Sequence, residues 1–135
     1  MARYYKLAAA LVGALSSYLF GGWPLLLEVL LILICIDYFT GLVAGAVEGK
    51  LSSAVGWKGI GRKICIFLLV AVAHFVDLVL GDKNLFRDAA IFFYLANELL
   101  SILENSGRIG LPIPPAIAQA VEILKGKGNM DSKTR

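Results

Sequence analysis

The stretch "LLLEVLLILICIDYFTGLVAGAV", residues 25–47, decides the fold class because it is the longest apolar run in the chain. Only Glu28 and Asp37 interrupt it with charge. A helix that crosses a bilayer needs about 20 mostly apolar residues, and this run reaches that length. We therefore predict a transmembrane helix here, although it carries a carboxylate, Asp37, near its middle.

The composition places the whole chain in the membrane class. The chain has 135 residues, 59% of them hydrophobic, and a mean hydropathy of +0.77. Its polar residues are too few to cover a soluble globule. Cys35 and Cys65 lie in apolar runs, so we expect buried small side chains and no disulfide framework. No motif for a nucleophile or a phosphate loop is present, so we expect no enzyme, metal site or cofactor.

Three further apolar runs accompany the first, at residues 7–20, 64–80 and 89–103. Turn-forming segments at residues 21–24, 48–63 and 81–88 separate the four runs. We predict an all-α membrane protein with about four transmembrane helices, forming one domain over residues 1–110. For the run at residues 7–20, a cleaved signal peptide and a helix lying on the membrane surface stay open as alternatives.

The basic residues are distributed unevenly around these predicted helices. With four spans, every Lys and Arg except Lys83 and Arg87 falls on one side of the membrane. Cytoplasmic loops of membrane proteins carry such an excess of basic residues. We therefore predict a multi-pass protein with both termini in the cytoplasm. Membrane topology, and not nucleic-acid binding, then accounts for the net charge of +3.

Residues 111–135 differ in character from the rest. The segment "GLPIPP", residues 110–115, cannot form a continuous helix. Ile117, Val121 and Leu124 then recur at helical spacing. They predict a short amphipathic helix on the membrane surface or on a partner subunit, followed by a disordered basic tail.

The helix predicted at residues 25–47 can tolerate Asp37. A central carboxylate costs about 2.5–3.5 kcal/mol on the insertion scale, whereas the Leu, Ile, Val and Phe residues of the run together return about 6 kcal/mol. Gly41, Gly45 and Gly49 follow at four-residue steps, so they share a helix face with Asp37. Small residues at this spacing allow close helix packing, either between copies of the chain or within one subunit.

Polar residues also interrupt the third and fourth runs. His74 and Asp77 are neighbours on one helix face and could form a local pair or a proton-sensing pair. In a membrane, the polar stripe of the fourth run must face protein or water. With Asp37, it would line either the bundle interior or an aqueous lumen. The stripe recurs at steps of three and four residues: Tyr94, Asn97, Glu98, Ser101, Glu104 and Asn105.

Several short motifs follow one another in a recognisable order. They are "DYFTG" (37–41), "GKLSS" (49–53), "KGIGRKI" (58–64), "NELLSILEN" (97–105) and "GLPIPP" (110–115). Over residues 37–124 they resemble the toxin secretion/phage lysis holin family, which includes clostridial toxin-cluster holins. The resemblance implies a homo-oligomer that contacts lipid in the bacterial cytoplasmic membrane. It also implies that the oligomer opens lesions, which release a cell-wall endolysin or assist toxin export.

Two other classes of function stay open on the sequence alone. A non-lytic scaffold subunit would bind a membrane partner and leave the membrane potential intact. A small ion or proton channel would use Asp37, His74, Asp77 and Glu98. Such a channel would give graded, pH-dependent flux without passage of proteins.

Overall fold

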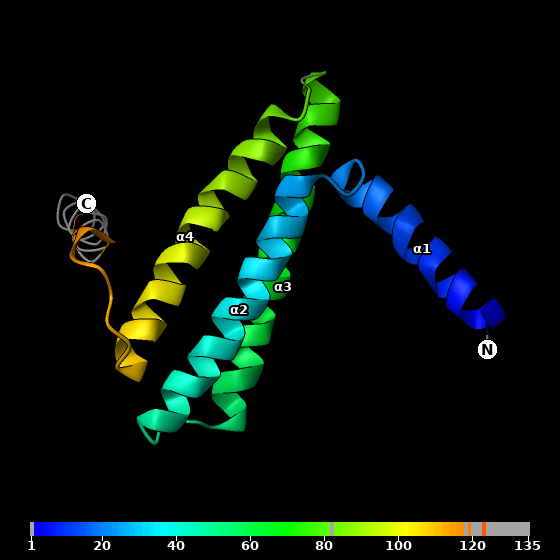
Figure 1. Cartoon of the computed structure of the whole chain (residues 1–135). Coiled ribbons are helices and arrows are strands. Elements are labelled where there is room, and N and C mark those ends of the chain that lie inside the picture. The colour runs from blue at the N-terminus through cyan, green and yellow to red at the C-terminus, as the bar shows by residue number, and fades with distance from the viewer. Residues whose placement is uncertain (1, 82, 118, 120–122, 124–135) are drawn as a thin grey trace.

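The computed structural model describes residues 2–81, 83–117, 119 and 123, which form four long α-helices and no strand. The predicted all-α class is therefore confirmed. Three helices lie side by side as a bundle, and the first diverges from them (Figure 1). In chain order the helices are α1 (Ala2–Phe20), α2 (Leu25–Val47), α3 (Ser53–Leu80) and α4 (Leu85–Ile109).

Helix α1 joins the bundle only through its C-terminal end. It ends at Gly21 and Gly22, which have φ of +75° and +118°, in the left-handed region that favours glycine. Phe20 is buried, with its ring centroid 6.4 Å from that of Trp23 and 6.1 Å from that of Phe67. Residues 2–15 are exposed.

Two helices of the described chain, α2 and α3, are long and apolar enough to cross a membrane. Helices α1 and α4 do not reach that apolar character, so four transmembrane helices do not follow from length and hydropathy alone. For α4 the reason is its polar stripe. Much of this stripe faces the other helices and not the outside.

The turn between α2 and α3 is shorter than predicted. Gly49, at φ +70°, lies beyond the end of α2. Its N–H donates to Ala46 O at 3.2 Å, and Lys50 N–H donates to Gly45 O at 2.8 Å. These two bonds form a Schellman motif, which ends the helix. The prediction that Gly49 shares a helix face with Asp37 is therefore wrong.

Helix α3 begins at Ser53, so residues 53–63, predicted as a loop, are helical. Ser52 caps it, because its side chain accepts a hydrogen bond from Val55 N at 3.2 Å. Two glycines in this segment misled the prediction. A Cβ at Gly56 or Gly59 would lie 3.3 or 3.2 Å from the Tyr38 side chain. These glycines therefore bring α3 close to α2 and do not break the helix.

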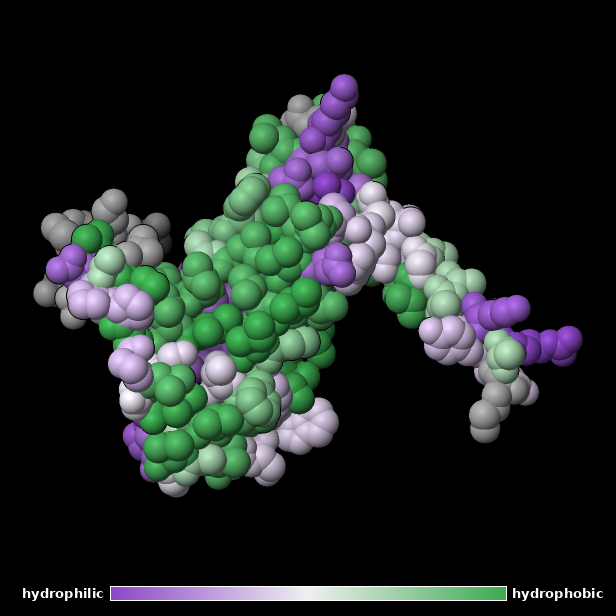
Figure 2. Space-filling view, viewed as in Figure 1, coloured by the Kyte–Doolittle hydropathy of each residue, from purple (hydrophilic) through white to green (hydrophobic). Residues whose placement is uncertain are grey.

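The bundle has an apolar exterior and several charged groups inside. Its buried apolar core contains Leu27, Leu30, Ile34, Val70 and Ile91. The outer face of the bundle is largely apolar, with hydrophilic residues gathered near the α3–α4 turn and on the free end of α1 (Figure 2). Cys35 and Cys65 belong to this outer surface, so the prediction that they are buried is wrong.

The chain leaves the helical bundle at the predicted C-terminal break. Helix α4 ends at Ile109, Gly110 has φ +98°, and residues 111–114 are not helical. The start of α4 at Leu85 also corrects the predicted 81–88 turn, because residues 85–88 are helical. The predicted amphipathic helix is described only in part, since Val121 and Leu124 lie outside the described residues, as does the basic tail.

Candidate functional site

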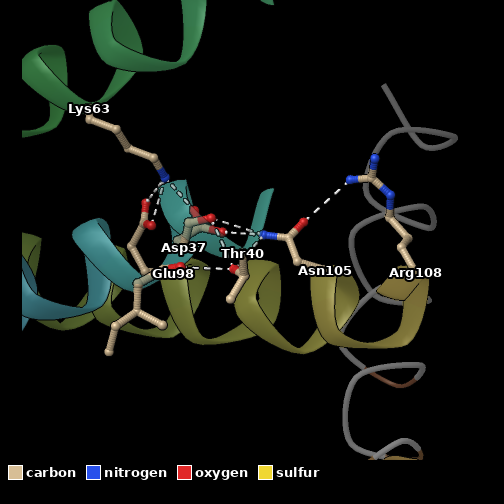
Figure 3. A network of polar contacts seen from close by, with 7 residues as sticks. Asp37, Thr40, Lys63, Glu98, Asn105 and Arg108 are labelled. Atoms are coloured by element: carbon tan, nitrogen blue, oxygen red, sulfur yellow. Dashed lines mark hydrogen bonds and ion pairs between the residues drawn. The ribbon is translucent and has the colours of Figure 1, made fainter. Parts of the chain in front are cut away.

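One lysine joins two carboxylates between the helices (Figure 3). Lys63 from α3 donates to Glu98 Oε1 and Oε2 on α4, at 2.7 and 2.6 Å, and to Asp37 Oδ2 on α2. The side chains of Asp37 and Glu98 are each only 5% exposed, and that of Lys63 is 20% exposed. The ammonium of Lys63 therefore links all three helices of the bundle through charge-assisted hydrogen bonds.

Asn105 extends this network along α4. Its Nδ2 donates to Asp37 Oδ1 at 2.8 Å, to Asp37 O at 3.1 Å and to Thr40 Oγ1 at 3.1 Å (Figure 3). Its Oδ1 accepts from Arg108 Nη1 at 3.4 Å. Asp37, which the sequence left without a partner, is thus bonded to both α3 and α4. In lipid these bonds have no water to replace them, so they favour the assembled bundle.

A cavity of about 780 Å³ opens beside this network, between α2, α3 and α4. Asp37, Lys63 and Glu98 line its wall together with Gly41 and Gly45. A Cβ at Gly41 would lie 3.5 Å from Asn105 Nδ2, and one at Gly45 would lie 3.7 Å from Leu51 Cδ1. Both glycines therefore pack against the chain's own residues.

A second polar cluster lies at the opposite end of the bundle. Asp77 accepts hydrogen bonds from Phe86 N at 2.8 Å and from Arg87 N at 2.9 Å. These are the amide positions that an N-cap side chain usually satisfies, and the cap residue, Asn84, makes no such bond. Asp77 of α3 therefore caps α4 from outside the helix.

His74 does not form the predicted pair with Asp77. It is buried, and its Nδ1 has no hydrogen-bond partner in the described part of the chain. It lies against the α1–α2 turn, where a Cβ on Gly21 would come within 2.7 Å of His74 Cε1. Buried Arg87 donates to Phe20 O at 2.8 Å and fixes the end of α1 beside it. The prediction of a His74–Asp77 pair is wrong because the α4 amides occupy the carboxylate.

An exposed ion pair joins the ends of α2 and α4. Arg108 Nε and Nη2 donate to Glu48 Oε1 and Oε2 at 2.9 and 3.1 Å. These hydrogen bonds lower the pKa of the Glu48 carboxyl below its usual range. Lys50 Nζ lies 3.9 Å from Glu48 Oε2 and adds a weaker attraction. The pair closes the basic end of the bundle.

The charged interior, the apolar exterior and the motif order are those of a small helical membrane protein. The sequence profile of the bacteriophage holin family matches residues 14–126. The chain belongs to the bacteriophage holin family. No solved structure matches it.

Relatives of this holin-family chain extend over almost its whole length. An uncharacterized protein of Halalkalibacterium halodurans is 49% identical over 93% of this chain and 97% of its own length. An uncharacterized protein of Clostridium perfringens is 36% identical over 93% of each chain. A protein of Bacillus phage phi105, named a probable holin, is 36% identical over 87% of this chain and 85% of its own.

The polar stripe of this holin-family chain is divided by the fold. Glu98 and Asn105 are buried in the network described above. Tyr94 and Ser101 are half-buried, and Asn97 is exposed, and all three line the cavity. Glu104 is exposed on α4 and lies outside the cavity lining. The structure thus gathers Asp37, Asn97, Glu98 and Ser101 at one site and places His74 and Asp77 at another.

Lys63 and Arg87 are not among the site residues that the sequence predicts. The apolar run begins at Ile64, so the sequence places Lys63 among the charges of the preceding loop. A signal was available in Ser52, a good N-cap residue that places Lys63 inside the helix. No sequence pattern indicates that Arg87 reaches the carbonyl of Phe20, since that contact depends on the path of the α1–α2 turn.

Proposed function

We propose that this chain is a working holin: copies accumulate in the bacterial cytoplasmic membrane, assemble and permeabilise it. The observation that carries the proposal is the polarity of the bundle. Charged side chains lie inside, where Lys63 bridges Asp37 and Glu98, whereas large apolar side chains such as Phe92 and Phe93 face outward. A water-soluble protein has the opposite arrangement, and lipid is the solvent that favours this one.

In this proposal α2, α3 and α4 all cross the membrane. The polar face of α4 is directed at the other helices, so its outer face can contact lipid despite its modest hydropathy. Lys50, Lys58, Arg62 and Arg108 lie toward one end of the bundle, at the C-terminal end of α2 and α4 and the N-terminal part of α3. The excess of basic residues at this end supports a cytoplasmic location for it.

The internal network gives a route from a closed subunit to an open lesion. In the closed subunit the two buried carboxylates share one cation, with Lys63 held between Asp37 and Glu98. When copies assemble, the helices can separate and expose these polar groups to a shared aqueous lumen. Water then forms hydrogen bonds with these polar groups, which lipid cannot do. Similarity to the phage phi105 probable holin supports release of a cell-wall endolysin as the outcome.

The test is induced expression in bacteria that also hold a cytoplasmic endolysin without an export signal. Culture turbidity and membrane potential are followed together, with holin alone and endolysin alone as controls. We expect depolarisation after a delay whenever the holin is expressed, and abrupt lysis only when the endolysin is also present. Steady growth with an intact potential would contradict the proposal and favour a scaffold subunit. A second culture that holds a cytoplasmic toxin in place of the endolysin tests toxin export.

An ion channel within a single subunit is the second candidate. The cavity favours it, because it reaches Asp37, Lys63 and Glu98 from one end of the bundle. However, packed apolar residues, including Val70 and Ile91, lie between this network and the Asp77 cluster. A proton or ion would have to cross that layer. Depolarisation without release of the endolysin would favour this second function.

A further inference from the structure

The cavity beside Lys63 has an excess of positive charge toward its mouth. Its two carboxylates, Asp37 and Glu98, are both bound to Lys63. The other charged residues that line it are basic: Lys50, Arg62 and Arg108. Glu48, which is outside the lining, pairs with Arg108 and lies near Lys50. Arg62 makes no ion pair among the described residues, so the mouth of the cavity can attract an anion.

The mouth lies at the level of a lipid head group if the bundle spans the membrane. Helix α3 has 28 residues and is therefore about 42 Å long, whereas the hydrocarbon core is about 30 Å thick. The basic N-terminal part of α3 carries the excess length. It presents Trp57, which is 72% exposed, together with Lys58 and Arg62. Tryptophan and basic side chains are typical of the membrane–water interface.

Apolar side chains also contribute to the wall of the cavity. Leu42 from α2, Leu51 from the turn, and Val55 and Ile66 from α3 contribute to it. A free inorganic anion would make no use of these side chains. A ligand with a phosphate head and a hydrocarbon chain would match both parts of the lining, since basic pockets between transmembrane helices suit anionic lipid head groups.

We propose that this cavity binds an anionic phospholipid of the cytoplasmic leaflet, with its phosphate at Arg62 and an acyl chain that runs past Ile66 toward the bilayer centre. The inference rests on the proposed membrane-spanning function. Bound lipid fills the space between α2 and α3 and keeps water away from the Lys63 network. The surrounding leaflet therefore contributes to the closed state of the subunit.

The test uses the full-length protein purified in a neutral detergent, titrated with phosphatidylglycerol, with phosphatidylcholine of the same acyl chains, or with inorganic phosphate. Binding is followed by native mass spectrometry and by the shift in melting temperature. We expect phosphatidylglycerol to bind at least about tenfold more tightly than phosphatidylcholine, and inorganic phosphate to give no stabilisation. Each basic residue near a membrane surface contributes about 1 kcal/mol, so Arg62→Gln should weaken phosphatidylglycerol binding about fivefold.

Lys58→Gln is the matched control, because it removes the same charge one turn away from Arg62 and lies outside the cavity lining. It should change the affinity by less than about twofold. Val55→Trp provides a charge-neutral variant that fills part of the cavity on the mouth side of Arg62, so it should also weaken binding. This variant decides the matter if Arg62→Gln does not fold.

Equal binding of the two lipids, or equal losses in Arg62→Gln and Lys58→Gln, would overturn the inference, as would unchanged binding by Val55→Trp. Stabilisation by inorganic phosphate alone would identify a free anion as the ligand and would also overturn it. The outcome is separable from the proposed function. A protein that lyses cells without any lipid preference would leave the holin activity standing and remove only the lipid site.

Discussion

Replacing Lys63 by methionine removes the one cation that the two buried carboxylates share. Methionine keeps the length and much of the volume of the lysine side chain, so the change is mainly one of charge. Asp37 and Glu98 then face each other without a counterion, and each loses at least one charge-assisted hydrogen bond. We expect the α2–α3–α4 bundle to be strongly destabilised.

The size of the effect follows from the geometry of the network. Removing one partner of a buried ion pair costs about 3–5 kcal/mol. Two unit charges about 4 Å apart repel each other by about 4 kcal/mol at the effective dielectric of a protein. The Lys63 side chain keeps 20% of its surface exposed, so water moderates the loss. We therefore expect a decrease of about 3 kcal/mol in the free energy of unfolding, a change of more than about a hundredfold in the unfolding equilibrium.

The assay is reversible unfolding in mixed micelles, in which a denaturing detergent is titrated into a mild one and tryptophan fluorescence is recorded. Lys58→Met is the control, since this exposed residue makes no ion pair in the described chain, and it should stay within about 0.5 kcal/mol of the wild type. Adding Glu98→Gln to Lys63→Met should recover part of the loss by removing one of the two charges. If Lys63→Met alone unfolds like the wild type, the network does not hold the helices together and our reasoning about the closed subunit is wrong.

Three further predictions concern the other contacts between elements. Asp77→Ala should lower the free energy of unfolding by about 1–2 kcal/mol, because two α4 amides lose their cap, and Asp77→Asn should lower it less. Gly21→Ala should lower the melting temperature, whereas Gly13→Ala should not. Only Gly21 has a positive φ, and a Cβ there would collide with the imidazole of His74. The stability difference between wild type and Arg108→Gln should shrink in acid. The pKa of Glu48 is lowered in the folded state, so its contribution is complete above the unfolded pKa, about 4.3, and is lost as pH falls through the folded value.

The apolar runs predicted the helices well, because periodicity and length depend on local sequence. The bounds of α2, Leu25–Val47, agree with the longest apolar run of the sequence, residues 25–47. The start of α3 was missed, because Gly56 and Gly59 indicate a loop when they are read locally. Only contact with Tyr38 on α2 shows that they are packing positions. Glycine therefore misleads where its small size serves a tertiary contact and not a turn.

The polar residues could be identified from the sequence, but their partners could not. Asp37 and Glu98 stand out because charge is rare in such runs. Their common partner depends on how α2, α3 and α4 are rotated against one another, and no spacing within one helix encodes that rotation. The same limit explains the error at Asp77. A neighbour at the next turn, His74, suggested a local pair, whereas the start of the following helix supplies two amides to the carboxylate.

The two polar clusters also affect how the bundle can open. Each joins different elements by bonds that lipid cannot replace: Lys63 and Asn105 link α2, α3 and α4 at one level, and Asp77 links α3 to α4 at another. Partial separation in lipid would leave buried charges without partners, at about 2.5–3.5 kcal/mol for each. Separation into water carries no such penalty, because water satisfies the same groups. The fold therefore resists gradual opening and favours a change in which helix separation and entry of water occur together.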